Sequence, residues 1–166
     1  MKGITLIGMP GVGKSTVCKL LASELQWNFI DVDELIYQLR GISHDEFLKV
    51  HGEEALKNLE EKLTLEQNLI NSVFSPPGSI IFSKKAMNKI KDETKVFYLK
   101  SSLDKIIKQL GDKIDKNGII GLAENGIEGV YLEREPIYNS YADEIINAEE
   151  LDAERICRLI IEDINV

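Results

Sequence analysis

Arginine and positive charge are scarce in this sequence. Four arginines occur among 166 residues, and 20 lysines and arginines face 28 aspartates and glutamates, for a formal net charge of −8. An acidic chain of this kind has no broad basic surface for nucleic acid or an anionic membrane. Because arginine is the side chain that grips carboxylates and phosphates bidentately, we expect any anion site to be small and local.

Cysteine and long apolar segments are scarce as well. The two cysteines, Cys18 and Cys157, lack metal-type spacing, which predicts buried reduced thiols and no zinc site. No apolar run approaches the roughly 20 residues of a membrane span, and no cleavage-like region follows the first apolar residues. We therefore expect a cytoplasmic protein with no membrane partner, folded as one domain over residues 1–166.

Short apolar runs alternate with helical patterns along the chain. Strands are predicted at "ITLIG", "NFIDVD", "SVFS", "KVFYLK" and near "EIINA", and helices at 14–25, 33–41, 43–52, 53–68, 84–90, 102–110, 127–142 and from about 152. This order predicts an α/β fold of three layers, a five-stranded parallel sheet with helices on both faces. Ligands are expected at the carboxyl ends of the strands. The polar, glycine-containing stretch at about 111–125 is the candidate lid.

The stretch "GMPGVGKS" fits the phosphate-binding pattern Gly-x-x-x-x-Gly-Lys-Ser/Thr between a predicted strand and a predicted helix. Its backbone N–H groups and the positive helix end can cradle phosphate oxygens. Lys14 can span the β- and γ-phosphates of ATP, and Ser15 can bind Mg²⁺. The expected nucleotide-binding residues are Gly11, Val12, Gly13, Lys14, Ser15 and Thr16. A glycine-rich turn without a ligand is the alternative.

Two aspartates close the second predicted strand. Asp31 and Asp33 are two residues apart, so on a strand they share a face and can both look toward the phosphate loop. One could organise Mg²⁺ through water while the other takes a proton from, or holds, an acceptor hydroxyl. In the simpler alternative, Asp33 caps the following helix.

With these residues in place, the chain resembles the shikimate kinase family over nearly its whole length. The resemblance rests on "LIGMPGVGKSTV", "FIDVDELI", "GISHDEFLKVHGEEALKNLE", the turn near "SPPGS", and "LEREPIYNSYAD", each at the expected relative position. It implies a P-loop kinase fold, use of ATP and Mg²⁺, a monomer, and a substrate-binding helical part at about 33–62. It further implies that Asp31 helps to organise Mg²⁺, that Asp33 binds substrate hydroxyls and is a candidate base, and that Arg134 grips the substrate carboxylate.

Three departures from the family pattern concern the acceptor. Lys57 stands where the family has a carboxylate-gripping arginine, which turns a bidentate fork into a point charge. The family's Gly-Gly-Gly turn is represented by prolines followed by Gly78 and a serine, so two backbone donors are lost and Gly78 alone keeps its freedom. In the lid, Asn117 stands where the family has an arginine that contacts ATP and acceptor. Lys113 and Lys116 are near enough in sequence to supply the missing charge, and we expect Lys116 to do so.

Simpler interpretations exist for several of these residues. Arg134 could lie on a helix surface and pair with a glutamate, and Lys57 could form an exposed ion pair with Glu60 three residues later. Glu53 and a neighbouring glutamate could be acids of a helix first turn. The two histidines, His44 and His51, show no partner pattern, so the sequence assigns neither a catalytic role.

The leading hypothesis is therefore an ATP- and Mg²⁺-dependent kinase of a small hydroxylated acceptor, with shikimate first in line. The altered acceptor residues leave open a kinase of another small hydroxy acid or polyol, or a nucleotide-binding module without acceptor chemistry. An ATP hydrolase is a third possibility. A nucleoside monophosphate kinase is disfavoured because it calls for several arginines around the acceptor phosphate.

Overall fold

The computed structural model describes residues 2–116 and 118–165. Within these ranges, five strands form one parallel sheet in the order β2-β3-β1-β4-β5. The strands are β1 (Gly3–Ile7), β2 (Asn28–Asp31), β3 (Ser72–Ser75), β4 (Thr94–Lys100) and β5 (Glu144–Asn147). Because all the strands run the same way, their carboxyl ends meet at one edge of the sheet, where ligands of open α/β sheets bind.

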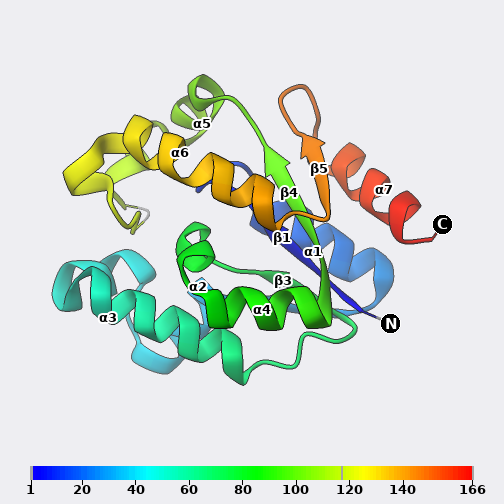
Figure 1. Ribbon diagram of the computed structural model, residues 1–166, viewed down its shortest axis with the longest axis horizontal. Coiled ribbons are helices and arrows are strands. Elements are labelled where there is room, and N and C mark those ends of the chain that lie inside the picture. Colours follow the sequence, from blue (N-terminus) through cyan, green and yellow to red (C-terminus); the bar gives the residue numbers. More distant parts are fainter. Residues whose placement is uncertain (1, 117, 166) are drawn as a thin grey trace.

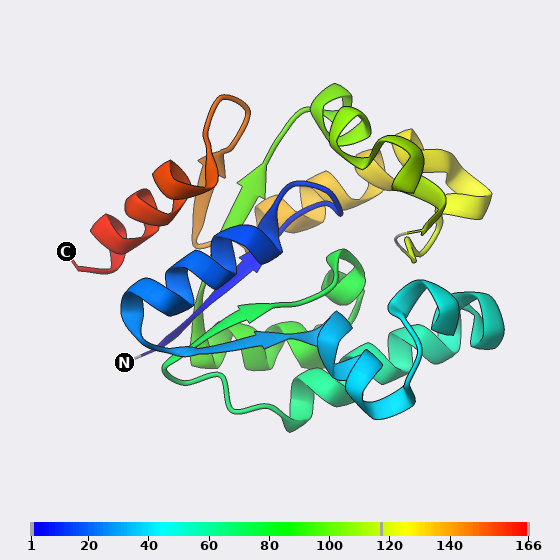
Figure 2. The same ribbon diagram turned by 180° about the vertical axis from the view of Figure 1, so that it is seen from behind.

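Helices cover both faces of the sheet (Figures 1 and 2). They are α1 (Lys14–Leu25), α2 (Val32–Arg40), α3 (His44–Glu66), α4 (Lys84–Glu93), α5 (Leu103–Leu110), α6 (Leu122–Tyr141) and α7 (Ala153–Ile164), with short 3₁₀ turns η1 (Gly78–Phe82) and η2 (Gly111–Lys116). One apolar core lies between the sheet and α1 with α7, and the other between the sheet and the group formed by α3, α4 and α6. The predicted three-layer α/β fold is confirmed.

Glycines break two of the helices. Gly52, with φ of 84°, separates the two predicted helices at 43–52 and 53–68, which follow each other as the two halves of α3. Gly126, with φ of 66°, bends α6, which begins at Leu122 and so earlier than the predicted 127. Positive φ is easy for glycine and costly for other residues, so the breaks fall where the chain can turn without strain.

The second strand is shorter than predicted. It ends at Asp31, and α2 begins at Val32 because the Asp31 side chain accepts hydrogen bonds from the N–H groups of Asp33 and Glu34. Asp33 therefore lies in the first turn of a helix, and the prediction that both aspartates share one strand face is wrong. The capping role considered for Asp33 belongs to Asp31.

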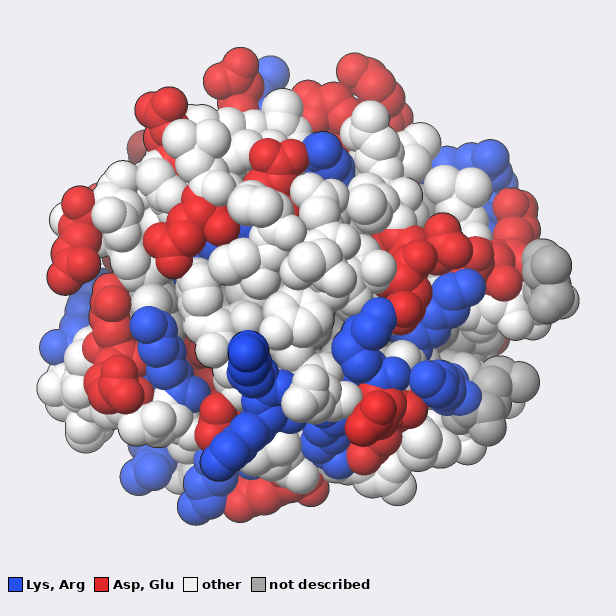
Figure 3. Space-filling view, viewed as in Figure 1, with Lys and Arg blue, Asp and Glu red and all other residues white. Residues whose placement is uncertain are grey.

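Charge is mixed over the visible surface. On the face shown in Figure 3, lysines and arginines are interspersed with acidic side chains around a central uncharged area. Among the residues that the structure describes, no helix combines the length and the apolar character that a membrane crossing requires.

Candidate active site

The phosphate loop connects β1 to α1. A Cβ at Gly8 would lie 2.7 Å from the carbonyl oxygen of Leu99, so only glycine lets the loop pass this close to β4. Gly13 precedes α1 with φ of 100°, and no side chain caps this helix end. The first N–H groups of α1 are thus left for an anion, and the helix dipole favours negative charge there.

Lys14 is buried at the start of α1, and its side chain reaches back to the loop. Its Nζ donates to the carbonyl oxygens of Gly8 at 2.7 Å and of Met9 at 2.9 Å. Burial lowers the pKa of Lys14 to about 8, although the nearby Asp33 carboxylate acts in the opposite direction. The loop therefore holds a partly desolvated ammonium group, for which negatively charged phosphate oxygens would be better hydrogen-bond acceptors than the two carbonyl oxygens.

The other expected nucleotide-binding residues divide into two groups. Gly11, Gly13, Ser15 and Thr16 line the same cavity as Lys14. Val12 does not: its side chain is buried in the core beneath the loop, and its N–H donates to the carbonyl oxygen of Met9 at 3.3 Å. Val12 therefore supports the loop by packing into the core and does not line the cavity.

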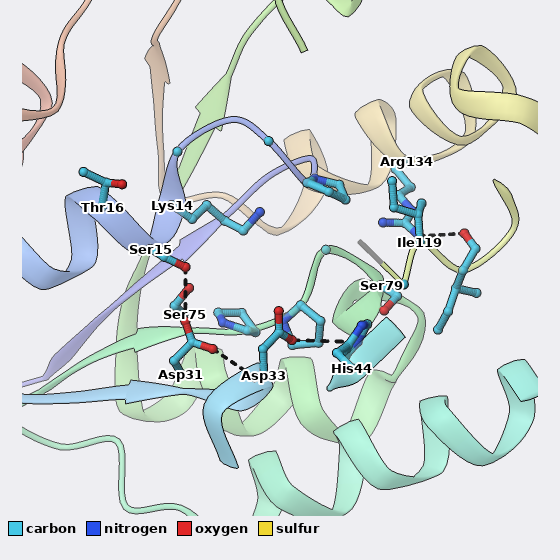
Figure 4. Close-up of a pocket in the computed structure, with 18 residues that line it drawn as sticks. Lys14, Ser15, Thr16, Asp31, Asp33, His44, Ser75, Ser79, Ile119 and Arg134 are labelled. Atoms are coloured by element: carbon cyan, nitrogen blue, oxygen red, sulfur yellow. Dashed lines mark hydrogen bonds and ion pairs between the residues drawn. The ribbon is translucent and has the colours of Figure 1, made fainter. Parts of the chain in front are cut away.

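Ser15 and Asp31 face each other across the start of α1. The Ser15 hydroxyl donates to Oδ2 of Asp31 at 3.1 Å, while Oδ1 of the same carboxylate caps α2 (Figure 4). A hydroxyl and a carboxylate oxygen side by side are hard ligands of the kind that Mg²⁺ takes, with water and phosphate oxygens completing its shell. The pair thus fits the metal role expected for these two residues.

Asp33 points into the cavity and faces a histidine that the sequence did not single out. Nε2 of His44 lies 3.8 Å from Oδ1 of Asp33 and 2.8 Å from Oε1 of Glu60. Glu60 is 1% exposed, and its second oxygen accepts the hydroxyl of Ser79 at 2.7 Å. The surrounding walls raise the pKa of the Asp33 carboxyl, and His44 acts against that rise. A chain of polar groups therefore runs from Asp33 to the turn before α4.

Arg134 approaches from the opposite wall. It is 2% exposed and donates to the carbonyl oxygen of Ile120 at 2.9 Å, so the alternative of an exposed ion pair on a helix surface is wrong. A Cβ at Gly78 would lie 2.8 Å from Nη1 of Arg134 and 2.9 Å from the Tyr138 hydroxyl, which donates to the Gly78 carbonyl oxygen. Gly78 is thus needed for this close fit, and Arg134 keeps donors for an anionic group in the cavity.

The two lysines expected near the acceptor lie apart from each other. Lys57 is not among the residues that line the main cavity; its Nζ lies 5.5 Å over the ring of Phe82, in a neighbouring hollow. No ion pair between Lys57 and Glu60 is found in the described ranges. Lys116 lines a second hollow that adjoins the main cavity at Ser15 and the aspartates. Asn117 falls outside the described residues.

These residues surround one cavity of about 280 Å³ at the carboxyl edge of the sheet (Figure 4). Lys14, Asp31, Asp33, Gly78 and Arg134 all line it. They come from the loop before α1, the start of α2, the turn before α4, and α6, so segments far apart in the sequence meet here. The arrangement places a phosphate cradle, a candidate metal pair, a candidate base and a buried cation around one space.

Comparison with known proteins agrees with this geometry. The family model for shikimate kinase matches residues 10–165. The chain belongs to the shikimate kinase family. Curated shikimate kinases from Caldanaerobacter subterraneus and Thermodesulfovibrio yellowstonii are 29% and 30% identical over 163 and 165 residues, which is 97% and 98% of this chain and 95% of each relative.

Solved shikimate kinases share the fold. That of Bacteroides thetaiotaomicron, 25% identical, superposes with a TM-score of 0.82 and coverage of 99% of both chains. The Acinetobacter baumannii enzyme in complex with shikimate, 24% identical, gives a TM-score of 0.85 over 99% of this chain and 93% of that one. The predicted P-loop kinase fold and the family resemblance are therefore confirmed.

Sequence reasoning missed His44, Glu60 and Ser79. One signal for Glu60 was present, because it continues the apolar helical face formed by Leu56, Leu59 and Leu63. A carboxylate on such a face is buried and needs a partner. No local pattern names His44 as that partner, because the two residues are 16 positions apart on either side of the Gly52 break.

Proposed function

We propose that this protein is a shikimate kinase that transfers the γ-phosphoryl group of ATP to the 3-hydroxyl of shikimate, a step of aromatic amino acid biosynthesis. The observation that carries the proposal is the single cavity lined by the phosphate loop, the two aspartates and Arg134. Family membership supports the proposal, as do the curated shikimate kinases that match this chain over almost their full lengths.

In this proposal each wall of the cavity holds one reactant. The N–H groups of the loop and Lys14 bind the ATP phosphates. Ser15 and Asp31 hold Mg²⁺, which when bound neutralises phosphate charge. Arg134 binds the acceptor carboxylate, and Asp33 accepts the proton of the hydroxyl as its oxygen attacks the γ-phosphorus and the bond to the β-phosphate oxygen breaks.

The same proposal assigns the residues at about 111–125 to a lid and those at about 33–62 to the part that binds the substrate. Lys116 lies at the hollow beside Ser15 and the aspartates, where its charge reaches the transferred phosphate when the lid packs down. Replacing Lys116 with alanine should lower turnover about tenfold or more while KM for shikimate changes little. An unchanged rate would remove Lys116 from the mechanism.

Lys57 can contact the acceptor only if its side chain moves away from the Phe82 ring. Kinetics of Lys57→Ala test this directly: a higher KM for shikimate at unchanged kcat would show that the side chain reaches the acceptor. Unchanged constants would show that Arg134 grips the carboxylate without Lys57.

The decisive experiment is an ADP-release assay with ATP and Mg²⁺, with and without shikimate, and with a panel of small hydroxy acids and polyols. Shikimate-dependent release that is lost in Asp33→Asn but kept in Asp92→Asn, an exposed carboxylate on α4, supports the proposal. Release only with another panel member would mean a different acceptor. Release without acceptor would indicate a hydrolase, and ATP binding without any release a nucleotide-binding module.

A further inference from the structure

Phe82 ends the 3₁₀ turn whose first residues line the main cavity. It is the last residue of η1, and Ser83, directly after it, caps α4 by accepting the N–H of Ala86 at 3.1 Å. The Ser83 hydroxyl also donates to the carboxylate of Glu61 on α3. These contacts fix the backbone beside Phe82, while its side chain stays 37% exposed. A substitution of this ring therefore leaves the buried core in place.

The ring of Phe82 attracts two cations that face different spaces. Cζ of Arg134 lies 5.7 Å from the ring centroid, and Nζ of Lys57 lies 5.5 Å from it. Both distances are within the roughly 6 Å at which an aromatic face attracts a cation. Arg134 lines the main cavity, whereas Lys57 and Phe82 line the neighbouring hollow of about 180 Å³. One aromatic ring therefore connects the cation of the acceptor site with a cation outside it.

The charges of the hollow also favour the observed position of Lys57. Three carboxylates line this space, those of Glu54, Glu60 and Glu61. Across residues 2–116 and 118–165, no ion pair joins Lys57 to any of them. The two oxygens of Glu60 bind His44 and the Ser79 hydroxyl instead. Lys57 thus lies in a space of negative potential, and the ring is the contact that holds its ammonium group.

Arg134 has very different surroundings on the other side. It is 2% exposed and donates to the carbonyl oxygen of Ile120 at 2.9 Å. In the part of the chain that the structure describes, no carboxylate forms an ion pair with it. A buried guanidinium needs compensation, and the face of the Phe82 ring supplies part of it. The ring therefore supports Arg134 without using the donors that a carboxylate in the cavity would accept.

We propose that Phe82 is a positioning residue for acceptor binding: its ring holds Lys57 in the hollow and supports Arg134, so that Arg134 alone binds the acceptor carboxylate. The inference rests on the proposed kinase function, because it presumes that the main cavity takes the acceptor. Without the ring, the long flexible side chain of Lys57 can turn toward the cavity past Ser79, which lines both spaces. Phe82 thus decides whether one cation or two meet the acceptor.

The first test is an NMR measurement that needs no activity. The ring current of Phe82 should shift the ε-CH₂ resonance of Lys57, assigned by its loss in Lys57→Arg, upfield. We expect Phe82→Tyr to keep this shift and Phe82→Leu to abolish it. Saturation with shikimate, in the presence of ADP and Mg²⁺, should leave it unchanged. The proposal is wrong if the resonance has the same position in Phe82→Leu as in the unmodified protein, or if shikimate removes the shift.

The second test is a double-mutant cycle on shikimate-dependent ADP release. In the unmodified protein and in Phe82→Tyr, Lys57→Ala should leave KM for shikimate unchanged. In Phe82→Leu the same change should raise KM about threefold or more at similar kcat, because Lys57 then reaches the carboxylate. Lys62→Ala, an exposed position of α3, is the control in each background and should have no effect.

An equal effect of Lys57→Ala with and without the ring would overturn the proposal. Should the unmodified protein release no ADP with shikimate, the proposed function fails. The NMR comparison of Phe82→Leu with the unmodified protein still decides whether the ring holds Lys57 in the hollow.

Discussion

ATP binding should make this protein take up a proton at mildly alkaline pH. In the structure Lys14 is buried against two backbone carbonyls, and its pKa is lowered to about 8. At pH 8.5 a group with this pKa is about one quarter protonated. When ATP phosphates replace the carbonyls, their negative charge restores the pKa of Lys14 to well above 8.5. Binding should therefore consume about 0.75 proton per ATP.

Isothermal titration calorimetry at pH 8.5 measures this number. The binding heat is compared in buffers that differ in ionisation enthalpy, and the slope is the number of protons taken up. Lys14→Arg provides the matched variant because arginine stays charged at this pH, so any binding that it retains should show no uptake. Lys19→Gln, an exposed position of α1, should keep the full uptake.

A slope near zero for the unmodified protein would refute the reasoning, because it would mean that Lys14 is already fully charged before ATP binds. A slope that survives in Lys14→Arg would assign the proton to another group. Either result would show that burial does not lower the pKa of Lys14 as the structure indicates.

Three further outcomes follow from the same contacts. Lys14→Met should stabilise the unligated protein by about 1–3 kcal/mol at pH 7, measured by chemical denaturation. The reason is that a charged lysine whose pKa is lower in the folded state than in the unfolded state destabilises the fold. This gain in stability should shrink as the pH rises from 8 to about 10.5, because the folded protein then loses the charge. Arg134→Lys should raise KM for shikimate about tenfold to a hundredfold, at little change in ATP affinity, in steady-state assays. Gly118→Ala should lower kcat, because its Cβ meets His44 at 2.3 Å and the lid cannot pack down; equal kcat would contradict this.

Local patterns in the sequence were enough to predict the frame of the site. The phosphate loop depends on glycines and a lysine within eight consecutive residues, and the order of strands and helices follows from hydrophobic periodicity. The predicted strand ran past Asp31, and the alternative in which Asp33 caps the helix named the wrong aspartate. Neither hydrophobic periodicity nor the phosphate-loop motif shows at which residue β2 ends and α2 begins.

The acceptor side was decided by tertiary structure. The sequence predicted that both Lys57 and Arg134 contact the acceptor, yet the fold turns Lys57 onto the Phe82 ring and buries Arg134 in the cavity wall. By itself the sequence determined the kind of fold and the place of the phosphates, because those depend on short segments. Only the packing of α2, both halves of α3 and the lid could bring His44 between Asp33 and Glu60, because a contact across 16 residues and a broken helix leaves no periodic trace in the chain.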